Sequence, residues 1–305
     1  MRRTCLDAIH RLARADERVV FIGSDLGPGT LDAMREEMPE RFFMEGVAEQ
    51  NVVGTAAGMA LEGFVPYVNT IATFLTRRCL EQTALDACLH DAPVRLVANG
   101  GGLVYAPLGP THCAIEDLAL MRALPNMTVL APADANEMAR LMPATVDHPG
   151  PLYIRLAKGG DRLVTRDEVP AAIGPAVPYG DPGDVCLVTT GVMLQRALEA
   201  AEILEADGIT AGIVHCPTVK PLDTATLADH ARHTRLLVTV EEHVVNGGLG
   251  TAVLETLTGG PPLKRLGLPH RFVENYGNQE GLLERLGLTA EGIAGAVRRE
   301  LAERA

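Results

Sequence analysis

The stretch that decides the fold is Gly46-Val47-Ala48-Glu49-Gln50-Asn51, which leads into a run of small and apolar residues from Val52 to Leu61. Because this run has almost no polar position, we expect a helix that is buried on all sides. Glu49 lies in its first turn. A carboxylate there can simply complement the positive helix N-terminus. It can equally be desolvated, which would raise its pKa and make it a proton donor, and the residues alone leave both interpretations open.

The composition predicts a folded, acidic protein. The chain has 305 residues, with 47% apolar and 22% charged residues, which is enough for two packed α/β domains. A formal net charge of −12 argues against binding to nucleic acid or to an anionic membrane surface. No apolar run approaches the roughly 18 residues of a membrane span, and an acidic residue interrupts the N-terminus before a signal sequence could form. The six cysteines show no paired spacing, so we expect reduced thiols and a soluble, cytoplasmic protein.

The hydrophobic pattern predicts two doubly wound, mainly parallel α/β domains. Short apolar runs that end in glycine or polar residues alternate with helical periodicity in both halves of the chain, as in buried parallel sheets. We expect the first domain at residues 1–165, a linker rich in proline and glycine at 166–184, and the second domain at 185–305. In such sheets, ligand-binding loops follow the carboxyl ends of the strands.

The stretch around Glu49 resembles the pyrimidine-domain motif of the transketolase family of thiamine diphosphate enzymes. The resemblance implies that Glu49 bonds the N1′ nitrogen of the cofactor's aminopyrimidine ring. Protonation of N1′ favours the imino tautomer, whose N4′ can remove the thiazolium C2 proton. A dry helical setting that raises the pKa of a glutamate above about 4.3 would suit this role.

The same resemblance implies further cofactor contacts. Asp25 and Leu26 follow the first predicted strand in a loop that the family places beside the cofactor, although the residues alone favour a turn or capping role for Asp25. Phe74 would stack on the aminopyrimidine, whereas a lone Phe after a strand is more often a core residue. Arg77 stands where sugar transketolases tend to carry an aromatic residue and deoxyxylulose phosphate synthases an arginine, and we assign it to the cofactor site as well.

Substrate contacts are implied by a second motif, Gly109-Pro110-Thr111-His112. In the family, the histidine of this motif contacts substrate hydroxyls and moves protons, so His112 joins Glu49 as a catalytic candidate, against the alternative of a loop or capping residue. Arg155 is the candidate for binding a substrate phosphate, with Arg3 as a weaker one. Leu108 replaces the aspartate that sugar transketolases usually carry before this motif, so the donor and acceptor stay open.

The resemblance covers only half of a full transketolase. The sequence contains no Gly-Asp-Gly, the start of the motif that holds Mg²⁺ and the diphosphate in this family. We therefore expect a partner chain that supplies this domain and binds most of the metal, an α2β2 heterotetramer, and no activity without the partner. The implied reaction moves a two-carbon ketol unit from a ketose or ketose phosphate to an aldehyde. The alternatives are the beta subunit of a 2-oxo acid dehydrogenase and a catalytically silent regulatory subunit.

Overall fold

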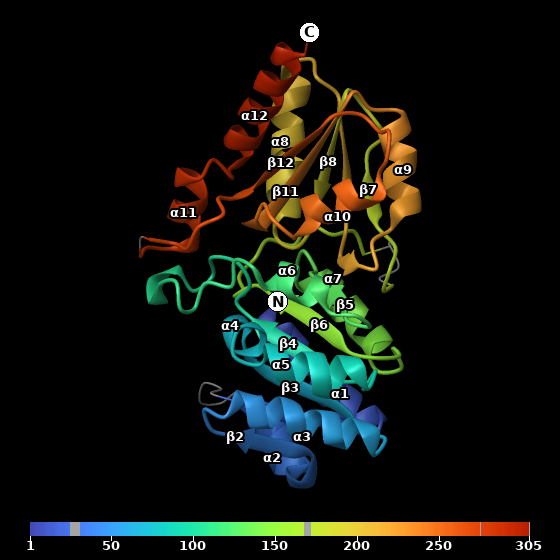
Figure 1. Ribbon diagram of the computed structural model, residues 1–305, viewed down its shortest axis with the longest axis vertical. Coiled ribbons are helices and arrows are strands. Elements are labelled where there is room, and N and C mark those ends of the chain that lie inside the picture. Colours follow the sequence, from blue (N-terminus) through green and yellow to red (C-terminus); the bar gives the residue numbers. More distant parts are fainter. Residues whose placement is uncertain (25–30, 168–171, 275, 305) are drawn as a thin grey trace.

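The computed structural model describes residues 1–24, 31–167, 172–274 and 276–304. They form two halves that follow one another along the long axis of the molecule, and each half is a β-sheet covered by helices (Figure 1). Asp25 and Leu26, two of the predicted cofactor contacts, lie outside the described residues. Within the described ranges, no helix combines the length and the apolar character that a membrane crossing requires. All six cysteine side chains are buried and unpaired with one another.

The first half of the chain is built around a seven-stranded sheet with the order β10-β5-β6-β4-β3-β1-β2. Its strands are β1 (Val19–Ser24), β2 (Phe42–Glu45), β3 (Val65–Ile71), β4 (Arg95–Asn99), β5 (Thr128–Leu130), β6 (Leu152–Leu156) and β10 (Thr218–Lys220). All neighbouring pairs are parallel except β10 with β5. Every residue of β1, β4 and β6 is buried, as their largely apolar sequences predict, and this includes Arg95 in β4 and Arg155 in β6.

Helices cover both faces of this sheet. One face packs against α3 (Glu49–Leu61), α4 (Ala72–Thr76), α5 (Leu80–Gln82), the π-helical turn η2 (Thr83–Leu89) and α6 (Asp117–Ala123). The other packs against α1 (Arg2–Ala15), α2 (Asp32–Glu37), α7 (Ala135–Leu141) and η4 (Met142–Thr145). Two short 3₁₀ turns, η1 (Pro39–Arg41) and η3 (Ala106–Leu108), complete this half. Strand side chains alternate between the two cores, since Ile22 lies in one and Phe21 in the other.

The second half holds a five-stranded sheet with the order β12-β11-β8-β9-β7. Its strands are β7 (Val177–Tyr179), β8 (Val185–Thr189), β9 (Ala211–His215), β11 (Leu236–Val244) and β12 (Leu263–Leu268), with β7 antiparallel to β9. Helices α8 (Met193–Ala206), α11 (Gln279–Arg285) and α12 (Ala290–Glu303) cover one face, and α9 (Thr224–Arg232) and α10 (Leu249–Thr256) the other (Figure 1). The prediction of two doubly wound, mainly parallel α/β domains is confirmed.

The two halves are interlocked. β10, which belongs by sequence to the second half, adds an antiparallel edge strand to the first sheet. In return, Leu103 and Ile115, on the loop between β4 and α6, are buried in the core of the second half. β7 lies within residues 166–184, so part of the expected linker is a strand of the second sheet. Contacts across the halves therefore determine how the loop between β4 and α6 is held.

Helix α3 differs from the prediction of burial on all sides. Val52, Val53, Ala56, Ala57 and Ala60 are buried against the sheet, but the opposite side of the helix is exposed, and Leu61 keeps 59% of its surface. The prediction was wrong for this chain because α3 is an outer layer, with the sheet and η2 on one side and solvent on the other. The small residues along it leave an apolar surface open.

Candidate active site

The predicted catalytic residues meet at one edge of the first sheet. Ser24 ends β1, Phe74 lies in α4 directly after β3, and His112 lies on the loop that follows β4. These are neighbouring parallel strands, so their carboxyl ends open at the same edge. Glu49 enters this edge from the first turn of α3. The tertiary structure thus brings together residues that are as many as 88 positions apart in sequence, from Ser24 to His112.

The Glu49 carboxylate is almost completely buried, with 1% of the residue exposed. Its Oε1 accepts a hydrogen bond from Ser24 Oγ at 3.0 Å, and its Oε2 accepts one from Arg78 Nη1 at 2.5 Å. Burial pushes the pKa of Glu49 up, but hydrogen bonds from Arg78, from its own backbone amide and from Ser24 outweigh burial and hold the pKa below the ordinary value. Of the two interpretations that the residues left open, a raised pKa is not found in the chain alone, because Arg78 pairs with the carboxylate.

Aromatic and cationic side chains surround the ring of Phe74. The Arg78 guanidinium carbon lies 4.2 Å from the centre of this ring. The His112 ring lies 5.4 Å from it, with the two planes at 65°, an edge-on arrangement. The structure therefore brings the candidate residues Glu49, Phe74 and His112 together, and Arg78, which contacts two of them, was not among the sequence candidates. Its position four residues after Phe74 in a helical segment was the available signal.

Arg77 holds the loop that carries His112. Its guanidinium pairs with Glu116 and donates to the backbone carbonyls of Pro110 and Cys113, each at 2.8 Å. These bonds fasten the loop on both sides of His112. The prediction that Arg77 contacts the cofactor finds no support in this arrangement, because its N–H groups are already used by the loop.

Arg155 is buried, with 7% of the residue exposed. Its Nε and Nη2 donate to the two oxygens of Asp117 at 2.8 and 3.0 Å, and Nη2 also reaches the carbonyls of Ala114 and Glu242. Burial alone would lower the pKa of Arg155, but the neighbouring Asp117, Glu242 and Tyr153 keep it above the ordinary value. The expectation of a phosphate-binding arginine is not supported here, because the guanidinium is committed to an ion pair with Asp117 inside the first half and to the Glu242 carbonyl of the second half.

The remaining substrate candidate, Arg3, lies on the surface of α1. Its side chain is 95% exposed and comes within 3.7 Å of Asp7, one helical turn away. Such a surface pair contributes little to stability. Nothing in its surroundings connects Arg3 to the site around Glu49 within the described part of the chain.

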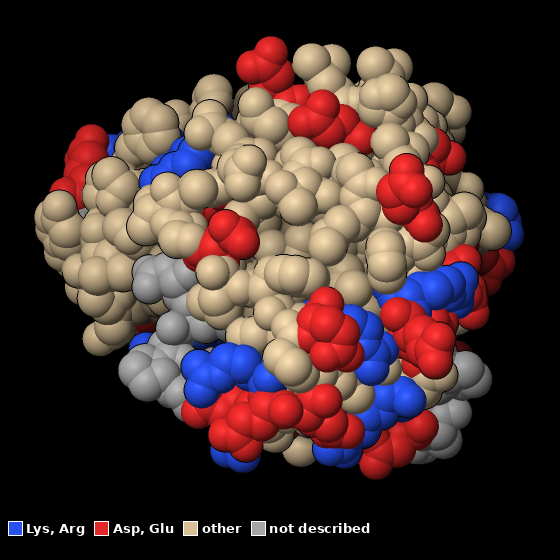
Figure 2. All heavy atoms as spheres, turned by 90° about the horizontal axis from the view of Figure 1, so that it is seen from below, with Lys and Arg blue, Asp and Glu red and all other residues tan. Residues whose placement is uncertain are grey.

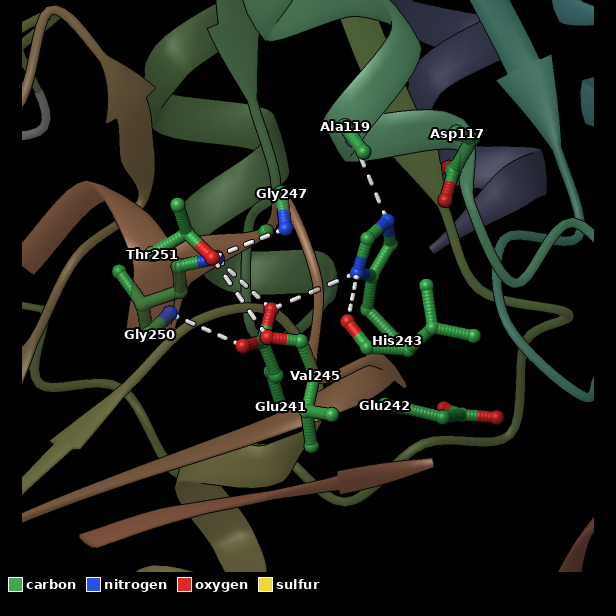
Figure 3. Close-up of polar contacts among 12 residues, drawn as sticks. Asp117, Ala119, Glu241, Glu242, His243, Val245, Gly247, Gly250 and Thr251 are labelled. Atoms are coloured by element: carbon green, nitrogen blue, oxygen red, sulfur yellow. Dashed lines mark hydrogen bonds and ion pairs between the residues drawn. The ribbon is translucent and has the colours of Figure 1, made fainter. Parts of the chain in front are cut away.

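Close behind the His112 loop, three consecutive residues of β11 form a buried polar cluster (Figure 3). Glu241 accepts hydrogen bonds from the first amides of α10, those of Leu249 and Gly250, at 2.7 and 2.9 Å. Desolvation raises the pKa of Glu241 to about 7 and lowers the pKa of His243 to about 4, so burial favours the neutral form of both side chains. His243 Nδ1 lies 2.6 Å from its neighbour's carbonyl, which leaves Nε2 to accept from the Ala119 amide at 3.2 Å.

Glu242, between them in sequence, points to the loop instead. Its Oε1 accepts a hydrogen bond from the Leu103 amide at 2.7 Å, and both of its oxygens lie 2.9 Å from Gln279 Nε2. Gly102 has φ of +69°, and a Cβ at this position would lie 2.6 Å from the Glu242 carboxyl carbon. Only glycine fits both constraints. Gly102 therefore serves close packing between the halves, whereas Gly100 and Gly101 lie against Tyr105 and Arg155 of the first half.

Comparison with known proteins agrees with this architecture. The family model of the transketolase pyrimidine-binding domain matches residues 1–160, and that of the transketolase C-terminal domain matches residues 180–293. A solved split gene transketolase, described as an inactive β4 tetramer, superposes with a TM-score of 0.91 at 37% identity and covers 99% of this chain and 98% of that one. The chain therefore belongs to the transketolase family, whose members depend on thiamine diphosphate.

Two relatives differ in the share of their own length that this chain covers. It is 40% identical to 1-deoxy-D-xylulose-5-phosphate synthase 1 of Geobacter sulfurreducens over 97% of this chain but only 47% of that protein. It is 42% identical to a putative uncharacterised transketolase family protein of Sinorhizobium fredii, over 88% of this chain and 79% of the relative. The chain thus spans about half the length of the Geobacter synthase.

The residues present fit the aminopyrimidine end of the cofactor. A buried carboxylate and an aromatic ring both contact the flat guanidinium of Arg78, and the same pair of groups suits a flat heterocycle with basic nitrogens. For the diphosphate end, no group of three or more His, Cys, Asp or Glu side chains arranged to hold a metal ion is found in the described ranges.

Proposed function

We propose that this chain is the pyrimidine-binding subunit of a split, thiamine diphosphate-dependent transketolase. The complete enzyme would move a two-carbon ketol unit from a ketose or ketose phosphate to an aldehyde. The observation that carries the proposal is the convergence of Glu49, Phe74 and His112 at one sheet edge, in a chain that aligns end to end with a split gene transketolase.

Thiamine diphosphate, when bound, supplies an acidic carbon whose deprotonated form adds to a ketose carbonyl. Glu49 would hold a proton at N1′ of the aminopyrimidine, which calls for a buried carboxyl group in a fixed orientation, and the Ser24 hydroxyl helps to orient it. Phe74 would position the ring by stacking. His112, at the edge of Phe74, would exchange protons with substrate hydroxyls.

The partner chain would supply the diphosphate and Mg²⁺ site, and an apolar surface suits its docking. Figure 2 views the end of the molecule that carries β2, α2 and α3, and shows a broad, mostly uncharged area with scattered acidic side chains beside a band of mixed charge. The exposed large apolar residues of β2, α3, η2 and their connections are Met44, Val47, Leu61, Phe64, Leu85 and Leu89. An exposed patch of this kind marks an interaction surface. We propose an α2β2 heterotetramer that uses it.

A second candidate reaction is the formation of a deoxyketose phosphate. It is favoured by the 40% identity to the Geobacter 1-deoxy-D-xylulose-5-phosphate synthase and by Leu108, which stands where sugar transketolases usually carry a hydroxyl-binding aspartate. A beta subunit of a 2-oxo acid dehydrogenase shares the architecture and would reveal itself by lipoamide-dependent oxidation. A silent regulatory subunit is the remaining alternative.

The test is reconstitution with a chain that carries the diphosphate-binding half. We expect tight binding of thiamine diphosphate with Mg²⁺ to the mixture, followed by ketol transfer in a substrate screen. Glu49→Gln should reduce the rate of the reconstituted enzyme by at least about 100-fold, the lower end for loss of a proton-transfer group. Glu205→Gln, at an exposed position of α8 in the second half, is the matched control and should keep full activity. Unchanged activity in Glu49→Gln would favour the silent subunit.

A further inference from the structure

Arg78 lies between the two groups that define the candidate pyrimidine site. Its Nη1 is 2.5 Å from Glu49 Oε2, and its guanidinium carbon is 4.2 Å from the centre of the Phe74 ring. One guanidinium thus pairs with the buried carboxylate and stacks on the aromatic ring at the same time. These are the two contacts that the proposed function assigns to the aminopyrimidine of the cofactor.

A guanidinium and a protonated aminopyrimidine resemble each other chemically. Both are flat, delocalised cations with N–H donors in the plane. Either can give a carboxylate a charge-assisted hydrogen bond and lay its face on an aromatic ring. At 4.2 Å, the guanidinium and the Phe74 ring are in direct contact. The aminopyrimidine ring therefore cannot lie on Phe74 while the guanidinium stays there.

The guanidinium is the movable member of this group. The Arg78 side chain is 37% exposed, whereas that of Glu49 is 1% exposed. In the described part of the chain, the hydrogen bond of Arg78 to Glu49 is its single side-chain hydrogen bond, while the adjacent Arg77 makes four. Arg77 is therefore anchored, and Arg78 can leave by breaking one ion pair and one stacking contact.

We propose that Arg78 is a placeholder for the aminopyrimidine: it occupies the pyrimidine site of the cofactor-free chain and must swing out before the cofactor can bind. This inference rests on the proposed function, which identifies the ligand of the site. The placeholder keeps a buried carboxylate paired when no cofactor is present, which removes the cost of an uncompensated charge. Binding of the cofactor is then an exchange of one flat cation for another.

The test uses the aminopyrimidine fragment alone, 4-amino-5-hydroxymethyl-2-methylpyrimidine, titrated into the full chain by calorimetry. If Arg78 occupies the pyrimidine site in about 90% or more of the molecules, removal of its guanidinium should tighten binding of the fragment at least about tenfold. We expect this gain in Arg78→Ala. Arg78→Gln keeps an N–H donor without the charge and should gain less. It also provides a folded variant if the unpaired Glu49 destabilises Arg78→Ala.

Arg166→Ala is the matched control, because Arg166 stacks on Tyr179 at 4.7 Å and lies outside the proposed site. It should bind the fragment like the original chain. Fragment binding by both Arg78 variants that is equal to or weaker than that of the original chain would overturn the placeholder. Thiamine diphosphate binding by the reconstituted complex, measured in parallel, tests the proposed function separately. Binding there without a gain in the variants refutes the placeholder alone, and absent binding there refutes the proposed function.

Discussion

Replacement of Arg155 by methionine tests whether this arginine joins the halves or binds substrate. The Asp117 carboxylate is fully buried and accepts hydrogen bonds from Arg155 Nε at 2.8 Å, from Arg155 Nη2 at 3.0 Å and from the Tyr153 hydroxyl at 2.8 Å. In Arg155→Met, only the tyrosine bond remains. An acidic side chain would then be left buried without its cation.

The magnitude follows from this burial. Loss of one partner of a buried ion pair typically costs about 3–5 kcal/mol, because the remaining charge keeps its desolvation penalty without compensation. The double variant Asp117→Leu/Arg155→Met removes both charges and should recover part of the loss. It will not recover all of it, because the Glu242 carbonyl loses the Arg155 donor, at about 1–3 kcal/mol for a group left unsatisfied, whereas the Ala114 carbonyl still accepts from the Gly102 amide at 2.8 Å.

Denaturant unfolding followed by circular dichroism measures both variants, and a double-mutant cycle gives the coupling between the two side chains. We expect the single variant to be less stable than the double variant. An ordinary surface substitution changes the free energy of unfolding by no more than about 0.5 kcal/mol. If Arg155→Met stays within that range and the reconstituted enzyme instead loses affinity for a phosphorylated substrate, Arg155 is not a structural ion-pair partner. Arg155 would then be the phosphate ligand that the sequence predicted.

Three further predictions concern the two halves and their surfaces. Gln279→Glu places a second carboxylate beside Glu242. Hydrogen exchange of the backbone amides in residues 100–113, measured by mass spectrometry, should then rise on the order of tenfold. Adding Glu242→Gln should restore the original exchange rate, since the swapped pair again has one charge and one amide. Burial lowers the pKa of His243 to about 4, against about 6.5 in the unfolded chain. Because the unfolded chain takes up a proton at this residue first, the stability that the neutral His243 contributes is complete above about pH 6.5 and is lost as the pH falls toward 4. The melting temperature of the original chain relative to His243→Gln should therefore rise with pH across that window, and a flat difference would contradict the burial of this histidine. Leu61→Glu, on the exposed side of α3, should leave the melting temperature unchanged but prevent assembly with the partner in analytical ultracentrifugation, whereas intact assembly would place the interface elsewhere.

From the sequence alone, the fold class and the main buried strands could be predicted, and the candidate site residues could be named. Apolar runs bounded by glycine or polar residues predicted β1, β4 and β6, because strands buried on both faces tolerate few polar positions. The motifs around Glu49 and His112 identified both residues as candidates through the family resemblance, and the structure places them at the carboxyl edge of the first sheet. The family resemblance drawn from these motifs is confirmed by the domain matches.

Only the tertiary structure decided which partner each charged side chain acquires. Arg77 and Arg78 are adjacent in the turn between α4 and α5, yet one binds the His112 loop and the other binds Glu49, because their side chains leave the turn in different directions. Arg155 meets Asp117 across 38 positions of sequence. The pKa of Glu49 depends on such a contact and could not be predicted from a local pattern. Electrostatic energies fall with distance in space and not along the chain, so they are fixed only when the fold is complete.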